Sequence, residues 1–360
     1  GIMAGCCGCR EDEVIFTAGA TESNNLIVFS FLKKKLLSPG IHAKKPRIIT
    51  SAIEHASVWE AVKALESLGF DIAVANPDST GRITPEEVSR HLTENTALVL
   101  VMLCNNETGI IQPVAEISRT VHEFCRKYNL KIHVHTDAVQ AFGKIWCSFK
   151  DIGVDSASIS SHKLGGPRGS GALILKKNAS IRQTGFLSYG GGQEQELRPG
   201  TENVAGISGF AQAAKTWTTH IHDNHRKALE LMNICREGLS KIKGILFVPE
   251  SRLADLQEYF SPYILSVSVP PVPAEVMVRS LDEHGISVSS GSACHTRDKK
   301  KRRRILESMG FEKSIIDSAI RISTGPQTTR ADIDALVAAM KETVPLLSQL
   351  SGRMKKRERQ

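Results

Sequence analysis

The chain has 360 residues, of which 41% are hydrophobic, and its formal net charge is +8. This length favours two domains with sizeable cores. The sequence holds no run of 18 apolar residues, so we expect no transmembrane helix and no membrane association. The positive charge lies in two short stretches, 297–304 with a net +6 and 353–360 with a net +4. The rest is close to neutral, so nucleic-acid binding is not expected.

The eight cysteines lack the paired spacing of a small secreted disulfide scaffold. We therefore expect a reducing compartment and a cytoplasmic location. The opening CCGC has no second pair of ligands, so no metal site is predicted. There is no signal-peptide pattern. The first 17 residues predict the end of a helix running into a strand, as if an earlier segment were missing.

Residues 1–220 predict a large α/β domain. Short apolar strands alternate with helical patterns such as 113–128, which starts with a proline. This alternation favours a mostly parallel, seven-stranded sheet with helices on both faces. The predicted strands are 13–18, 47–52, 71–77, 97–103, 131–137, 156–161 and 171–176.

Residues 221–350 predict a smaller α+β domain. A long polar helix at 222–242 leads to strands at 264–269 and 285–290. Two helices follow, near 311–319 and 330–350. The basic tail, 351–360, is predicted to be disordered.

Polar residues follow several of the predicted strands, where parallel α/β sheets bind ligands. The sequence GATESNN offers free N–H groups and a helix dipole to a phosphate, although Thr21 or Ser23 could be an ordinary helix cap. His55 follows the second strand, where a structural role is also common. Asn106 follows the fourth strand, where an asparagine can cap a turn.

The fifth and sixth strands are followed by Asp137 and by Lys163. A buried aspartate needs a cationic partner, and a protonated ring nitrogen would serve. Lys163 lies in SISSHKLGGPRGSG, among small residues that leave room for a cofactor. An anion seat, a stacking face, a carboxylate and an amine together match pyridoxal phosphate, whose aldehyde forms a Schiff base with lysine.

The motifs FTAGATESNN, EHASV, NNETG, HTDAVQAFGK, SSHKLGGPRGSGAL, GGGQEQELRPGTENVAG, SSGSACH and IRISTGPQTT occur in this order. The chain thereby resembles NifS-type cysteine desulfurases and selenocysteine lyases from about residue 5 to residue 350. These are pyridoxal phosphate enzymes of fold type I, related to class V aminotransferases. The resemblance implies that fold, this cofactor, and L-cysteine or L-selenocysteine as substrate.

The resemblance also implies residue roles. Lys163 should form the Schiff base, and the thiolate of Cys294 should attack the substrate sulfur or selenium, leaving alanine and a persulfide or perselenide. The other implied positions are His55 stacking on the ring, Asp137 at the ring nitrogen, Gln140 at the phenolic oxygen, Ala20, Thr21, Ser160 and His162 at the phosphate, and Asn106 and Arg321 at the substrate carboxylate. His55 is also expected to be catalytic, and Asn106 to contact the cofactor as well. Thr201 should reach the phosphate of a partner subunit, which implies a homodimer.

Three departures from the family pattern stand out. The family's N-terminal segment is missing, and Gln195 stands where an arginine is expected. The basic stretch 297–304 replaces a serine- and proline-containing loop; it is either a solvated loop or a docking site for an acidic protein that accepts sulfur or selenium.

Several functions remain open at this point. The chain fits a cysteine desulfurase, and a selenocysteine lyase is the main alternative. A catalytically impaired homologue that acts as a binding protein is a third possibility. An aminotransferase on the same fold is a fourth, although transamination needs no thiol such as Cys294.

Overall fold

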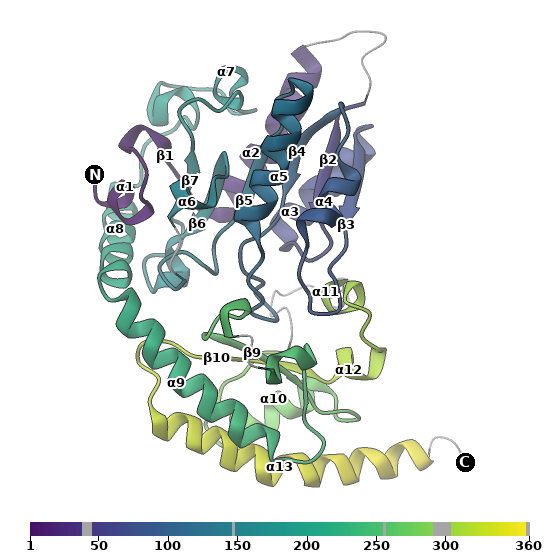
Figure 1. The fold of residues 1–360 in the computed structure, drawn as a ribbon. Coiled ribbons are helices and arrows are strands. Elements are labelled where there is room, and N and C mark those ends of the chain that lie inside the picture. The colour runs from purple at the N-terminus through teal and green to yellow at the C-terminus, as the bar shows by residue number, and fades with distance from the viewer. Residues whose placement is uncertain (38–44, 146–147, 255–256, 291–303, 358–360) are drawn as a thin grey trace. The chain divides into compact units, whose positions relative to one another are not determined.

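A computed structural model describes residues 1–37, 45–145, 148–254, 257–290 and 304–357 (Figure 1). The chain forms two compact units. Unit 1 comprises Gly1–Asn76, Ile83–Cys104 and Gln112–Ile221, and unit 2 comprises Pro77–Arg82, Asn105–Ile111 and His222–Gln360. The last change from unit 1 to unit 2 along the chain, between Ile221 and His222, lies next to the predicted boundary at 220–221. The two short segments Pro77–Arg82 and Asn105–Ile111 belong to unit 2, whereas the prediction assigns them to the first domain.

Unit 1 is built on a seven-stranded sheet with the order β1-β7-β6-β5-β4-β2-β3. The pairs from β3 to β6 are parallel, whereas β7 runs antiparallel to both β6 and β1. The predicted mostly parallel sheet is thus confirmed. Its strands are β1 Val14–Thr17, β2 Arg47–Ser51, β3 Asp71–Ala75, β4 Thr96–Leu100, β5 His133–Asp137, β6 Ser156–Ser160 and β7 Gly171–Leu175.

Helices cover both faces of this sheet. Neighbouring strand residues such as Ile48 and Ile49, which point to opposite faces, are both fully buried. Helices α2 and α3 share one core with alternate residues of β2, β4 and β7. The helices of unit 1 are α1 Ile2–Cys7, α2 Ala20–Leu37, α3 Ala56–Ser67, α4 Pro85–His91, α5 Val114–Tyr128, α6 Phe149–Ile152, α7 Ile181–Thr184 and α8 Val204–Thr219, with short 3-10 helices η1 Glu11–Glu13, η2 Ser161–Leu164 and η3 Gln193–Glu196.

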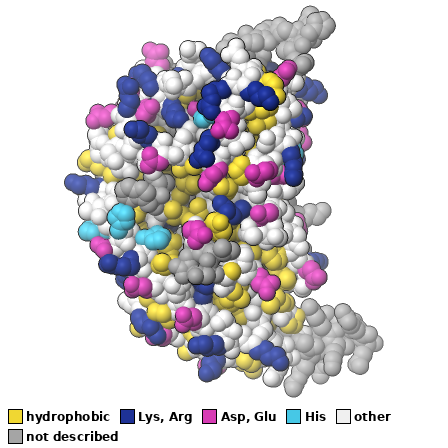
Figure 2. All heavy atoms as spheres, in the orientation of Figure 1, with side chains coloured by type: hydrophobic (Ala, Val, Ile, Leu, Met, Phe, Trp, Pro, Cys, Tyr) yellow, Lys and Arg dark blue, Asp and Glu magenta, His cyan; other side chains and the backbone are white. Residues whose placement is uncertain are grey.

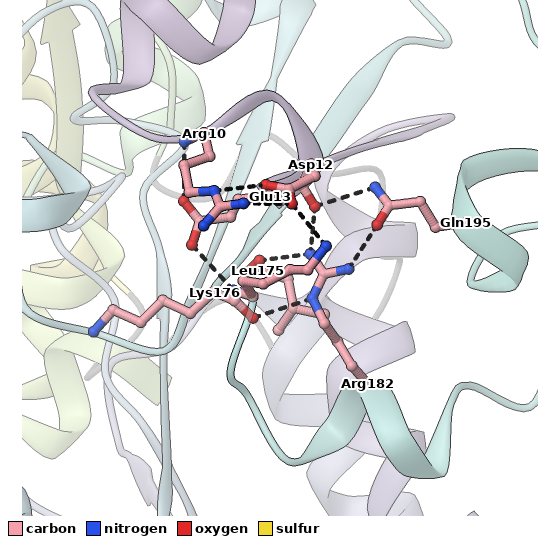
Figure 3. A network of polar contacts seen from close by, with 8 residues as sticks. Arg10, Asp12, Glu13, Leu175, Lys176, Arg182 and Gln195 are labelled. Atoms are coloured by element: carbon pink, nitrogen blue, oxygen red, sulfur yellow. Dashed lines mark hydrogen bonds and ion pairs between the residues drawn. The ribbon is translucent and has the colours of Figure 1, made fainter.

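The N-terminal residues form a helix and then a strand, as predicted, and a polar network secures them (Figure 3). Arg182 donates to the carbonyl oxygens of Asp12 and Leu175, both at 2.8 Å. Gln195 donates to the same Asp12 oxygen at 3.1 Å and accepts from Arg182 at 3.0 Å. A guanidinium has no acceptor. An arginine at position 195 could not accept this bond, which gives a local reason for the departure from the family pattern.

Unit 2 holds an antiparallel sheet with the order β10-β9-β8 and its own apolar core. Its elements are β8 Leu246–Phe247, β9 Ile264–Ser268, β10 Ala319–Ser323, α9 Ile221–Ser240, α10 Ala274–Glu283, α11 Arg304–Ser308, α12 Lys313–Asp317, α13 Arg330–Arg357, η4 Glu250–Leu253 and η5 Gln257–Tyr259.

Two predictions for unit 2 are wrong. Residues 285–290 do not form a strand, because only Ser289 pairs, in an isolated bridge with Arg321. Ile286 and Val288 instead pack against the core of unit 2 from an irregular segment, so their alternation reflects packing alone. Helix α13 extends to Arg357, into the tail expected to be disordered. The arginines, lysines and methionine of that tail are good helix formers, which explains the extension.

Within the described residues, no helix combines the length and apolar character needed to span a membrane. On the face of the molecule shown in Figure 2, basic and acidic side chains are interspersed. This distribution agrees with the near-neutral charge of the chain outside its two basic stretches.

Candidate cofactor and substrate site

Apart from Asn106, which belongs to unit 2, the residues predicted to hold the cofactor lie in unit 1, and several follow neighbouring strands. Asp137 ends β5, Ser160 ends β6, and Lys163 lies in η2 directly after β6. His55 follows β2 and caps α3, accepting from the Ser57 N–H at 3.2 Å. Because β2, β5 and β6 belong to the parallel part of one sheet, their carboxyl ends lie at one edge.

Asp137 is a buried carboxyl group, only 4% exposed. It accepts from Asn24 Nδ2 at 2.8 Å and from the Val139 N–H at 3.0 Å. Among the described residues, no lysine, arginine or histidine forms an ion pair with it. A buried carboxylate supplied only with neutral donors suits a protonated ring nitrogen as its cationic partner. The site therefore fits the pyridine ring of pyridoxal phosphate.

Asn24 connects Asp137 with His55. Its Nδ2 also donates to Ser57 Oγ at 2.8 Å, and that hydroxyl lies 2.9 Å from His55 Nδ1. Since Ser57 Oγ already accepts from Asn24, its own proton is available to His55 Nδ1. One fully buried asparagine thus places the two side chains predicted to contact the cofactor ring.

The predicted phosphate seat lies at the start of α2. Ala20 is the first helical residue and Thr21 is exposed, and N–H groups in a first turn have no partner within the helix. Ser160 Oγ lies 2.8 Å from His162 Nδ1. Burial, and then the charges of Lys163, Arg168 and Lys144, lower the pKa of His162. These cations would favour a bound phosphate.

A close backbone approach holds this turn against the sheet. A Cβ atom on Gly171 would lie 2.6 Å from Gly19 Cα and 2.8 Å from the Ile159 oxygen. Only glycine fits at the start of β7, so the sequence SGAL is explained by the turn before α2 lying directly against it.

Lys163 is half-buried, and its short helix is fixed from both sides. Trp217 Nε1 of α8 donates to the Leu164 oxygen at 2.9 Å. Gly165 ends η2 in the left-handed conformation, with φ 73°. These contacts determine the backbone that carries the lysine.

Gln140 and Thr201, the last two cofactor residues predicted for unit 1, differ in exposure. Gln140 is buried in the turn after β5. Thr201 is exposed in the loop that precedes α8.

The residues predicted for the substrate carboxylate lie in unit 2. Arg321 of β10 donates from Nη1 to the Asn106 carbonyl oxygen at 2.8 Å and from Nη2 to Ser289 Oγ at 3.4 Å. Asn106 Oδ1 is buried and has no hydrogen-bond partner among the described residues. Asn106 and Arg321 are thus brought together, as a carboxylate site requires.

Sequence reasoning missed Glu107, whose side chain is buried beside these residues at 5% exposure. Burial raises the pKa of Glu107 to about 7, against the lowering effect of the Arg304 and Arg321 charges. It also missed Glu54, which accepts from Ser51 Oγ at 2.5 Å and from the Met102 N–H at 2.7 Å, next to His55. The available signal was a glutamate in the turn that follows an apolar strand: Glu54 lies three residues after the end of β2, and Glu107 seven residues after the end of β4.

Cys294 lies outside the described residues, as does the basic stretch apart from Arg304. Within the described part of the chain, no three histidine, cysteine, aspartate or glutamate side chains are arranged to hold a metal ion.

Comparison with known proteins identifies the family. The profile of "Aminotransferase class-V" matches residues 4–336. The chain belongs to the class V aminotransferase family. A relative within this family, the cysteine desulfurase IscS of Methanosarcina thermophila, is 34% identical over 96% of this chain and 80% of its own length. The mitochondrial cysteine desulfurase of Saccharomyces cerevisiae is 36% identical over 94% of this chain and 64% of its own length.

A solved structure described as a NifS-like protein matches with a TM-score of 0.83 and 33% identity, covering 96% of this chain and 86% of that one. The resemblance to NifS-type enzymes is thereby confirmed. Membership of the class V aminotransferase family and this structural likeness imply dependence on pyridoxal phosphate.

Proposed function

We propose that this protein is a pyridoxal phosphate-dependent cysteine desulfurase. It would convert L-cysteine to L-alanine and leave the sulfur as a persulfide on Cys294. The observation that carries the proposal is the joint placement of Asp137 and His55 by Asn24, in a chain whose relatives at 34–36% identity are cysteine desulfurases.

The residues of unit 1 would hold the cofactor. The first turn of α2, with Ser160 and His162, would bind its phosphate, and Lys163 Nζ its aldehyde carbon. Asp137 would keep the ring nitrogen protonated, while His55 covers the ring face. When bound, pyridoxal phosphate supplies an electron sink for the bond broken at the substrate α-carbon.

The chain's own groups would carry the remaining steps. Arg321 would hold the substrate carboxylate through its guanidinium fork, supported by Asn106. Lys163 Nζ would move the proton at the α-carbon. The Cys294 thiolate would then take the sulfur: the carbon–sulfur bond breaks, a sulfur–sulfur bond forms, and the β-carbon gains a proton. L-cysteine and one thiol thus give L-alanine and one persulfide, with atoms in balance.

The test is to incubate purified protein with L-cysteine or L-selenocysteine under reducing conditions, and to measure alanine, sulfide and selenide. We expect alanine from L-cysteine, lost in Cys294→Ala. Borohydride should fix the cofactor to Lys163, as located by peptide mapping. Unchanged alanine production in Cys294→Ala would contradict the persulfide step. Alanine from L-selenocysteine alone would favour a selenocysteine lyase. The absence of alanine from both substrates would favour a binding protein.

We also propose a homodimer in which Thr201 reaches the partner's phosphate. Tyr189 and Val204, which flank Thr201 in the chain, are 77% and 68% exposed, as expected of apolar residues that a partner covers. Sedimentation should give twice the mass of one chain.

For the basic stretch 297–304 we propose docking of an acidic acceptor protein, which Lys-to-Glu changes there would weaken.

The cytoplasmic location stays a prediction. It is supported by the spacing of the eight cysteines, which is not that of a small secreted disulfide scaffold. Fractionation of cells that express the full chain would test it.

A further inference from the structure

A row of buried polar side chains runs between α2 and the strands β5 and β6 of unit 1. We call it the polar strip: Asn24, His133, His135, Asp137 and Ser156, each at most 4% exposed. The three β5 residues alternate along the strand and so share one face. Phe31 of α2 meets the His133 ring edge-on, with ring centroids 6.3 Å apart, so this face is turned toward α2.

Continuous hydrogen bonds join the polar strip. His133 Nε2 lies 2.7 Å from Ser156 Oγ, and Ser156 Oγ lies 2.7 Å from His135 Nδ1. His135 Nε2 lies 3.0 Å from Asn24 Oδ1, with Ser158 Oγ also nearby at 3.3 Å. Asn24 Nδ2 then donates to Asp137 at 2.8 Å.

The directions of these bonds follow from Asp137. An ionised carboxylate only accepts, so Asn24 must present its Nδ2 there and its Oδ1 to His135. His135 must therefore donate from Nε2, which leaves Nδ1 to accept the Ser156 proton. Ser156 Oγ can then accept the N–H of His133 Nε2. Every donor in the strip is used once, and both imidazoles carry their proton on Nε2.

Charge on the histidines would break this pattern. A protonated His135 would donate from Nδ1 as well, and Ser156 Oγ would face two N–H donors with no acceptor for its own proton. Burial lowers the pKa of His135 to about 3 and that of His133 to about 4, so both rings are neutral at pH 7. The strip thus holds neutral donors with fixed directions behind Asp137.

We propose that His135 is a positioning residue for the cofactor ring, acting through Asn24. Its Nε2–H holds the Asn24 amide in the one orientation that donates to Asp137 and also to Ser57, whose hydroxyl serves His55. In the flipped orientation the amide oxygen would face the carboxylate oxygen of Asp137. Only the last step, that a pyridoxal ring lies at Asp137 and His55, rests on the proposed function.

The test compares three variants. His135→Leu removes the donor to Asn24, whereas His135→Gln keeps an N–H that can reach it. His91→Leu is the matched control, because His91 is a half-exposed histidine of the same unit that pairs with Glu87 in α4. Ser156→Ala is a second, milder variant should His135→Leu fail to fold, since it removes one hydroxyl, which donates to His135 Nδ1 and accepts from His133 Nε2.

The first readout needs no cofactor. In apoprotein labelled with ¹⁵N-histidine, two-bond ¹H–¹⁵N NMR at pH 7 should show neutral rings with Nε2–H at His133 and His135. In Ser156→Ala the Nδ1–H form of His135 should gain population. Nδ1–H or a cationic ring at His135 in the wild type would overturn the proposal.

The second readout is the affinity of the apoprotein for added pyridoxal phosphate, from fluorescence titration. Loss of one buried hydrogen bond predicts roughly tenfold weaker binding in His135→Leu, with His135→Gln close to wild type. His91→Leu should be unchanged. Binding by His135→Leu as tight as wild type, or no rescue by glutamine, would refute positioning. If the protein gives the expected result in both readouts but forms no alanine, the desulfurase proposal is refuted and the positioning role of His135 is not. If no cofactor binds at all, the histidine tautomers measured by NMR test the positioning role.

Discussion

A buried carboxyl group must be surrounded by donors, and Asp137 meets this need with an amide and a backbone N–H rather than with a cation. This choice leaves its charge available to a ligand. The surface carboxyl Asp71, by contrast, already pairs with Arg47 at 2.6 Å. At the scale of single residues, the absence of an ion pair within the described residues is what distinguishes a site carboxylate from a structural one.

Asp137→Asn should retain the shape of the site but remove the charge that keeps a ring nitrogen protonated. We expect alanine formation from L-cysteine to fall by roughly 100-fold, equivalent to about 2.7 kcal/mol of transition-state stabilisation. The assay is initial-rate alanine formation at saturating cofactor. Asp71→Asn is the control, with an expected rate near wild type. Turnover of Asp137→Asn within threefold of wild type would exclude the electron-sink role.

At the scale of elements, the site depends on how closely α2 approaches the sheet. The turn before α2 contacts the start of β7 through Gly19 and Gly171, with no space for a side chain. The same helix brings Asn24 to β5 and Ile27 to the core. Helix α2 therefore sets both the phosphate seat and the ring contacts.

Gly171→Ala should disturb this arrangement, because its Cβ would meet backbone atoms of Gly19 and Ile159 that cannot rotate away. We expect a loss of about 1–3 kcal/mol in the free energy of unfolding, measured by urea denaturation, together with weaker binding of pyridoxal phosphate. Gly192→Ala is the control, since a Cβ there has open space and φ is −80°. Equal unfolding midpoints for Gly171→Ala and wild type would show that the approach is not tight.

At the scale of the whole molecule, the sequence predicted the seven strands of unit 1 and the residues at their ends, because apolar runs and polar strand ends are local signals. The polar strip was missed although its signals were present. His133, His135 and Asp137 alternate on one strand face, and Asn24 lies in helical register with Ile27, Val28 and Phe31.

Other features could not be found locally. The membership of 77–82 and 105–111 in unit 2 depends on contacts far apart in the chain. Whether 285–290 forms a strand depends on pairing, and only Ser289 has a partner there. The roles of Cys294 and Thr201 remain predictions.

The two units should respond to pH in opposite directions. In unit 1, burial lowers the pKa of His133 to about 4 and of His135 to about 3. Between these values and the ordinary 6.5 the unfolded chain binds more protons, so unit 1 loses stability as pH falls below 6.5. In unit 2, burial raises the pKa of Glu107 to about 7 from 4.5. There the folded chain binds more protons, so unit 2 loses stability as pH rises from 4.5 to 7.

Calorimetric unfolding between pH 4 and pH 8 checks this prediction. Glu107→Gln should abolish the loss on the alkaline side, which is on the order of 3 kcal/mol for a shift of this size, and His135→Gln should reduce the loss on the acid side. Glu123→Gln and His91→Gln, at surface positions of α5 and α4, should follow the wild-type profile. Glu107→Gln could instead lose stability between pH 4.5 and 7 as the wild type does. Glu107 would then have to be charged in the folded protein, as the buried partner of an ion pair with Arg321.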